Sequence, residues 1–228
     1  MMSAQSSTII ETLKEVTRLN NEGVRFLAIC HPSEAHKRFK AALAMVNTHL
    51  GASEDFVLDA APGVGAPQLA TLAVPGMEDD TFYIHNQALA FNLEMFGSPE
   101  DFQMASSFLV FNLALSCHLG AMKTSSEPTA RTACRLYEMC ANLALSEEAS
   151  TAELDCLASS LAVASMNNVA QLTYRLAGNA PKAVEILNSL NPSPELTQTS
   201  YMSPEQLDEI ILNICTIMAT PVVAASAA

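Results

Sequence analysis

The stretch LNNEGVRFLAICHPSEAHKRFKAAL, residues 19–43, decides the fold. Apolar residues recur in it at intervals of three and four, which predicts amphipathic helix on both sides of a break. Pro32 forms the break because it cannot donate a hydrogen bond to the preceding turn, and Ser33 after it suits a helix N-cap. Gly51 is a natural end for the second helix. The stretch therefore predicts a helical hairpin over residues 7–50.

Helical periodicity returns three more times along the chain, at 101–147, 151–190 and 203–219. Residues 51–100 instead concentrate Pro and Gly, which predicts a long irregular insertion. Inside it, the piece FYIHNQALAFNLEMF at 82–96 fits either a short strand pair or a helix, because its periodicity does not decide. We expect one all-α domain over 1–228, built from three helical pairs, this insertion and a C-terminal capping helix at 203–219.

The composition favours a packed helical chain. The 228 residues are 50% hydrophobic and 15% charged, with 8 Gly and no Trp, which excludes a natively disordered acidic chain. Because 11 Lys and Arg face 24 Asp and Glu, the formal net charge is -13. A surface of that sign repels phosphate, so we expect no nucleic-acid partner and no anionic membrane surface as partner.

Cysteine usage and the N-terminus predict a cytoplasmic or nuclear location. The six cysteines show no CxxC spacing, and the first residues lack a basic stretch followed by an apolar run. Residues 102–122 carry no Asp, Glu, Lys or Arg, but they include Ser, Asn, Gln and His side chains that would be costly in lipid. We therefore expect a buried helix there and not a membrane span.

Small and aromatic residues alternate across the first hairpin in the order Gly23, Phe26, Ala35, Phe39 and Ala42. This spacing resembles a tetratricopeptide repeat (TPR), in which small residues let two helices approach and aromatic residues fill the space between them. Later pairs echo it, and an Asn-Asn pair at 167–168 mirrors the one at 20–21; the corresponding packing positions are Ala114, Ala133, Tyr137, Ala170 and Ala183. The resemblance implies a TPR-like stack of antiparallel helical pairs. A generic helical bundle stays the alternative, because helix-packing patterns are degenerate.

In a TPR-like stack the first helix of each pair lines a concave face. The resemblance implies a groove lined by amides and apolar side chains, namely Asn20, Val24, Leu27, Phe111, Leu115, His118, Asn167, Gln171 and Tyr174. Asn and Gln would bond the backbone of a bound peptide while the apolar side chains pack on it. The function that follows is a non-catalytic protein-protein interaction module or adaptor, whose partner is a protein or peptide. The alternative for each groove residue is that it belongs to the core between repeats.

Catalytic, cofactor and metal signatures are missing from the sequence. Gly63-Val-Gly65 lacks the third glycine of a dinucleotide fingerprint, and Cys30 and His31 adjoin, so on one helix they point about 100° apart. We expect no enzyme, no cofactor and no metal. The alternative function is a helical-bundle enzyme or small-ligand-binding protein with a site near Cys117, His118 and the insertion. Self-assembly into a homo-oligomer is a third alternative, because the end of a stack can pair with another copy.

Overall fold

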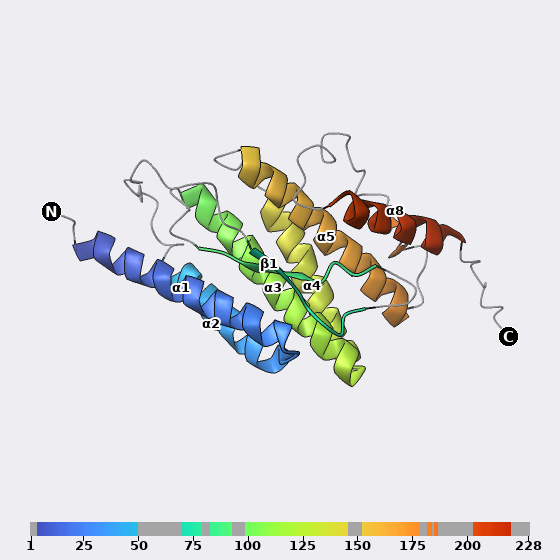
Figure 1. Ribbon diagram of the computed structural model, residues 1–228, viewed down its shortest axis with the longest axis horizontal. Coiled ribbons are helices and arrows are strands. Elements are labelled where there is room, and N and C mark those ends of the chain that lie inside the picture. Colours follow the sequence, from blue (N-terminus) through green and yellow to red (C-terminus); the bar gives the residue numbers. More distant parts are fainter. Residues whose placement is uncertain are drawn as a thin grey trace.

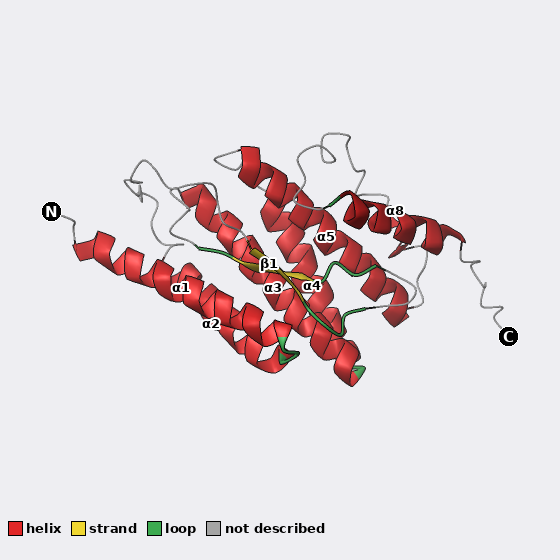
Figure 2. Cartoon of the chain, viewed as in Figure 1, coloured by secondary structure: helices red, strands yellow, loops and turns green. Residues whose placement is uncertain are grey.

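The computed structural model describes residues 4–49, 70–78, 83–92, 99–145, 152–177, 182–183, 185–186 and 203–219. Most of these residues are helical, so the all-α prediction holds at the level of fold class (Figure 2). The helices with defined bounds are α1 (Ala4–Ala28), α2 (Pro32–His49), α3 (Pro99–Thr124), α4 (Glu127–Leu145), α5 (Ala152–Ala177) and α8 (Pro204–Ala219). Two short strands, β1 (Ala70–Ala73) and β2 (Gln87–Ala90), pair antiparallel.

The helices pack in chain order. α1 lies on α2, α2 on α3, α3 on α4 and α4 on α5, and Figure 1 shows α1 and α5 on opposite sides of α3. The central helix α3 contains the window Met104–Thr124, which is long and apolar enough to cross a membrane by length and composition, but 89% of that window is buried inside the protein. The helix at 102–122 therefore lies in the core, as the sequence predicts.

Two chain reversals end on residues with left-handed backbone. Cys30 has a φ of 59° and Ser125 a φ of 50°. After α1, the N–H of Cys30 donates to the Leu27 carbonyl at 2.9 Å and the N–H of His31 donates to the Phe26 carbonyl at 2.8 Å. This is a Schellman motif, whose left-handed position usually carries glycine. The Pro32 break thus turns the chain as predicted, and Pro32 itself occupies the first turn of α2.

The small residues predicted to let helices meet do lie at close helix contacts. A methyl group added at Gly23 would overlap the Phe39 ring, so only glycine allows α1 and α2 this approach. Phe26 is partly buried, with the Arg38 guanidinium carbon 6.0 Å from its ring centroid. The other positions predicted to pack are buried: Ala35, Phe39, Ala42, Ala114, Ala133, Tyr137, Ala170 and Ala183.

Most of the described part of the 51–100 insertion is extended, with a turn at 75–76, whereas Pro99 and Glu100 already belong to α3. β1 and β2 pair with Ala70 opposite Ala90 and Ala73 opposite Gln87. Of the two alternatives for residues 82–96, the helix is wrong for 83–92, and the segment supplies one strand of a pair whose other strand is β1 at 70–73. It lies across the helical layer, where asparagine side chains bond its main chain (Figure 1). The insertion's other residues up to 98 lie outside the described residues, as do residues 50, 146–147, 151, 178–181, 184 and 187–190 of the predicted pairs.

Candidate functional site

Six asparagines from four helices meet along one edge of the extended segment. We call residues 83–91 the resident segment and the six side chains the asparagine clamp. The clamp consists of Asn20 and Asn21 on α1, Asn112 on α3, Asn167 and Asn168 on α5, and Asn213 on α8.

Two clamp residues hold the first half of the resident segment, each through both polar groups of one main-chain unit. The N–H of Tyr83 donates to Asn213 Oδ1 at 2.8 Å, and Asn213 Nδ2 donates to the Tyr83 carbonyl at 2.8 Å. Asn168 holds His85 in the same way, with both distances at 2.9 Å. Both polar groups of a strand residue point to the same edge, which is why one amide can bond both.

The second half of the resident segment is held identically. The N–H of Leu89 donates to Asn112 Oδ1 at 2.9 Å, and Asn112 Nδ2 donates to the Leu89 carbonyl at 2.8 Å. Asn21 bonds the N–H and the carbonyl of Phe91 at 3.2 Å and 3.3 Å. Every held residue has an odd number because alternate residues of an extended chain present their polar groups to the same edge.

The remaining two asparagines brace the others. Asn20 Nδ2 donates to the Leu89 carbonyl at 2.9 Å, and Asn20 Oδ1 accepts from Asn112 Nδ2 at 2.9 Å. Asn167 repeats this on α5: its Nδ2 donates to the Tyr83 carbonyl at 3.1 Å, and its Oδ1 accepts from Asn213 Nδ2 at 2.8 Å. One arrangement of three asparagines therefore occurs twice along the resident segment.

The opposite edge of the resident segment pairs with β1. The N–H of Val74 donates to the Asn86 carbonyl at 2.9 Å, and the pairing continues to Ala70 and Ala90. All four residues of β1 are exposed, and Leu72 exposes 42% of its surface. The resident segment thus lies between helices on one edge and a short, solvent-facing strand on the other.

Aromatic rings pack against His85 and Phe91 of the resident segment, while the carboxylate of Glu209 acts on Tyr83. The His85 ring lies 5.9 Å from the Phe111 ring centroid and 6.4 Å from that of Tyr83. Burial lowers the pKa of His85 to about 4 and, as the main cause, raises the pKa of Tyr83 to about 12. Both side chains are therefore neutral at pH 7. The Phe91 ring packs 5.5 Å from that of Phe108.

Eight of the nine predicted groove residues are buried inside the protein, and they have different neighbours there. Asn20 and Asn167 bond the backbone of an extended peptide, which is the chain's own, and Phe111 lies against His85. Val24, Leu27 and Leu115 belong to the hydrophobic core, as the core alternative states. Gln171 is buried and Tyr174 partly so.

His118 lies in the interior against α4. Its Nδ1 lies 3.3 Å from the Tyr137 hydroxyl, and the two rings meet edge to face with centroids 6.0 Å apart.

Sequence reasoning named two of the six clamp residues as groove residues and missed Asn21, Asn112, Asn168 and Asn213. The signal was present in part, because asparagine inside a helix competes with the helical backbone for hydrogen bonds and so needs a reason to be there. The Asn-Asn pairs at 20–21 and 167–168 carry that signal, whereas Asn112 and Asn213 are each the only asparagine in their helix.

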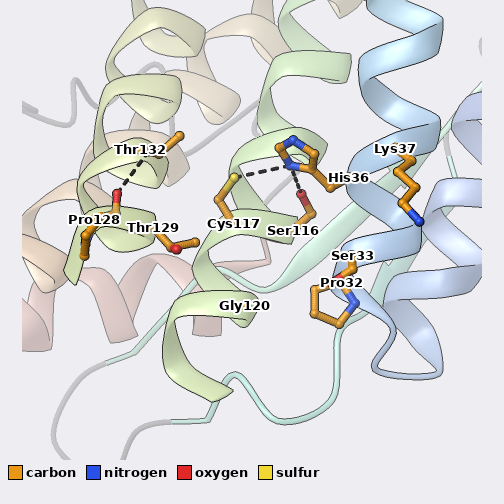
Figure 3. Close-up of a pocket in the computed structure, with 10 residues that line it drawn as sticks. All are labelled: Pro32, Ser33, His36, Lys37, Ser116, Cys117, Gly120, Pro128, Thr129 and Thr132. Atoms are coloured by element: carbon orange, nitrogen blue, oxygen red, sulfur yellow. Dashed lines mark hydrogen bonds between the residues drawn. The ribbon is translucent and has the colours of Figure 1, made fainter. Parts of the chain in front are cut away.

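A separate pocket of about 440 Å³ opens between α2, α3 and α4 (Figure 3). Its residues include Pro32, Ser33, His36, Lys37, Ser116, Cys117, Gly120, Pro128, Thr129 and Thr132. His36 Nδ1 lies 3.5 Å from Cys117 Sγ and 3.4 Å from Ser116 Oγ. The predicted alternative site paired Cys117 with His118, but the histidine that lines this pocket is His36.

The electrostatics of the pocket keep its thiol and imidazole neutral. Burial raises the pKa of Cys117, while burial and then the charge of Lys40 lower the pKa of His36. A nucleophilic cysteine needs the reverse, an imidazolium that stabilises a thiolate. Among the residues that the structure describes, no three His, Cys, Asp or Glu side chains come together as a metal site.

Comparison of the chain with protein-family models, with curated proteins and with solved structures finds no match.

Proposed function

We propose that this chain is a non-catalytic protein-interaction module or adaptor, whose concave helical face binds an extended polypeptide. The observation that carries the proposal is the asparagine clamp, in which four amides each bond both polar groups of one main-chain residue. These groups are common to all polypeptides, and an extended strand is the conformation that presents them in alternation along one edge.

The placement of the clamp supports a TPR-like stack. Its residues lie on α1, α3 and α5, which open the three predicted pairs, and on the capping helix α8. In such a stack these helices line the concave side. The buried small residues at the helix contacts, Gly23 and Ala35 among them, support the same arrangement.

The charge of the chain supports a protein partner over a nucleic acid. The net charge of -13 repels a phosphate backbone, and the clamp itself offers neutral amides without a Lys or Arg side chain. Amides of this kind recognise a strand by its main chain, so specificity must come from the side chains on either side of it.

The test is affinity purification from the native cell with three baits, followed by mass spectrometry. The baits are the wild type, the double variant Asn112→Ala with Asn168→Ala, and Asn142→Ala. Asn142 is an exposed asparagine on α4 outside the clamp, so Asn142→Ala is the matched control. We expect partners that the wild type and the control retain and the double variant loses, with helicity by circular dichroism unchanged. If all three baits retain the same partners equally, the face that carries the asparagine clamp is not the partner-binding surface.

A second candidate function, small-ligand binding, is favoured by the pocket between α2, α3 and α4. Thr132 lines this pocket, and Thr132→Trp would fill it without touching the clamp. Native mass spectrometry should then show a bound small molecule on the wild type and none on the variant. If the wild type and Thr132→Trp differ in mass only by the substitution itself, the pocket holds no small molecule and this second function is excluded.

A further inference from the structure

We infer that the asparagine clamp is an exchangeable site, whose partner supplies an uncharged extended strand that takes the place of residues 83–91. The resident segment competes with the partner strand for the clamp, so it sets the affinity that a partner strand needs in order to bind. This inference rests on the proposed function and adds the chemical class of the partner segment and the means of its control.

The first argument is what the clamp recognises. Its bonds to the resident segment go to the N–H and carbonyl groups of Tyr83, His85, Leu89 and Phe91 and to none of their side chains. A strand of another sequence offers the same groups at the same spacing. The hydrogen bonds of the clamp therefore do not distinguish the resident segment from a strand supplied by a partner.

The second argument is the cost of the vacant site. An apolar surface uncovered by a departing strand is unfavourable in water, whereas asparagine amides that lose a strand regain hydrogen bonds from water. Asn20, Asn112, Asn167 and Asn168 are buried while they bond the resident segment, so a departing strand would expose polar amides that water can hydrogen-bond.

The third argument is that the resident segment is held in two separate halves. One set of three asparagines holds residues 83 and 85, and the other holds residues 89 and 91. Gln87, between them, is bonded by no clamp asparagine among the described hydrogen bonds, and its strand partner on the other edge is the exposed Ala73. One half can therefore open while the other stays bound, which gives an incoming strand a place to start.

The resident segment also defines the chemistry of its replacement. Residues 83–92 contain no Asp, Glu, Lys or Arg. Ala88 is fully buried and Leu89 and Phe91 are 4% and 3% exposed, so the matching positions of a partner must be small, then apolar, then aromatic or apolar. A charged residue at any of them would lose its hydration without gaining an opposite charge.

The experiment measures binding of a fluorescent synthetic peptide, with the sequence of residues 81–94, to the full chain by anisotropy. The two proteins compared are the wild type and Leu89→Pro. Proline has no N–H to donate to Asn112 Oδ1, and this substitution leaves every clamp asparagine in place. We expect the peptide to bind Leu89→Pro at least about tenfold more tightly than the wild type, since the competitor has lost a bond to a buried amide. Equal affinities would overturn the inference.

Two modified peptides test whether the clamp is the site. N-methylation of the peptide at Leu89 removes the N–H that would donate to Asn112 Oδ1. This peptide should therefore bind at least about tenfold more weakly than the unmodified peptide. N-methylation at Gln87 changes a residue that no clamp asparagine bonds, so this control peptide should bind as the unmodified one does. Equal losses from both modifications would overturn the inference.

A measurement on the wild type alone covers the case in which Leu89→Pro does not fold. Adding excess unlabelled peptide to the ¹⁵N-labelled wild type should speed hydrogen exchange at the amides of His85 and Leu89 of the protein, because the resident segment is displaced. Unchanged exchange at a saturating peptide concentration would overturn the inference. That result leaves the proposed function standing if the clamp variants still lose native partners, so the two failures are distinguishable.

Discussion

Asn112 and Leu89 form a closed pair: the Leu89 N–H donates to Asn112 Oδ1 at 2.9 Å, and Asn112 Nδ2 returns a bond to the Leu89 carbonyl at 2.8 Å. The amide of one helical side chain thus supplies a donor and an acceptor as the edge of a β-strand does. Because α1, α5 and α8 repeat the pairing, a layer of helices presents a strand-like edge to an extended chain. This edge is the basis of the proposed recognition.

The substitution Asn112→Leu should strongly destabilise the chain. It keeps the side chain's size but leaves the Leu89 N–H and the side-chain oxygen Oδ1 of Asn20 buried without their bonds. Each unmade bond costs about 1–3 kcal/mol, so we expect a loss of about 3 kcal/mol in the free energy of unfolding. Denaturant titration measures it, and Asn142→Leu at an exposed position of α4 should cost under about 0.5 kcal/mol. Similar losses for both variants would contradict the role of the pair.

Alanine should have opposite effects at two helical glycines. Gly23→Ala forces a methyl group into the Phe39 ring and should destabilise by about 1–3 kcal/mol. Gly120→Ala meets only Thr129 Cγ2, at 3.9 Å, and should stabilise by about 0.5–1 kcal/mol through the higher helix propensity of alanine. Thermal melting of both variants measures this, and two melting temperatures shifted in the same direction would be incompatible with the close contact of α1 and α2.

Glycine should stabilise the turn after α3. Ser125 adopts a φ of 50°, a conformation that costs an L-residue about 1–2 kcal/mol and costs glycine almost nothing. Ser125→Gly should therefore raise the free energy of unfolding by about 0.5–1 kcal/mol after the added flexibility of the unfolded chain is counted. Cys30→Gly should gain less, because the Cys30 thiol also bonds the Pro75 carbonyl at 3.2 Å. A melting temperature lowered by Ser125→Gly would contradict the backbone strain at Ser125.

Stability should fall as the pH drops from about 6.5 toward 4. Burial lowers the pKa of His85 to about 4, so the unfolded chain takes up a proton in this range before the folded chain does. The stability contributed by neutral His85 is complete above pH 6.5 and should decline by about 3 kcal/mol by pH 4. His36, whose pKa burial also lowers, acts in the same direction.

Denaturant titration at pH 7 and pH 4.5 separates the two histidines. His85→Gln should remove most of the difference between the two pH values, and His36→Gln should remove a smaller part. A pH dependence unchanged in His85→Gln would show that the buried ring is not its source.

The helices and their contacts could be predicted because their signals are local. Pro32 ends one helix and begins the next whatever surrounds it, and Gly23, Ala35 and Phe39 lie at spacings that place them on facing helix surfaces. Two clamp residues, Asn20 and Asn167, were identified as backbone-binding amides for the same reason, since helical spacing puts them on the predicted concave side. Asn112 and Asn213 carry no such signal, because each is the only asparagine of its helix and has no Asn-Asn neighbour.

The sequence by itself determined where the chain is helical, where it turns and which small residues allow helices to meet, because periodicity and backbone chemistry act over a few residues. Only the tertiary structure decided what the asparagine clamp holds. Its bonds join residues 69 positions apart, as for Asn20 and Leu89, and 130 positions apart, as for Asn213 and Tyr83. An extended strand held by its main chain leaves no side-chain pattern in the sequence, so its site becomes visible only when the helices are placed around it.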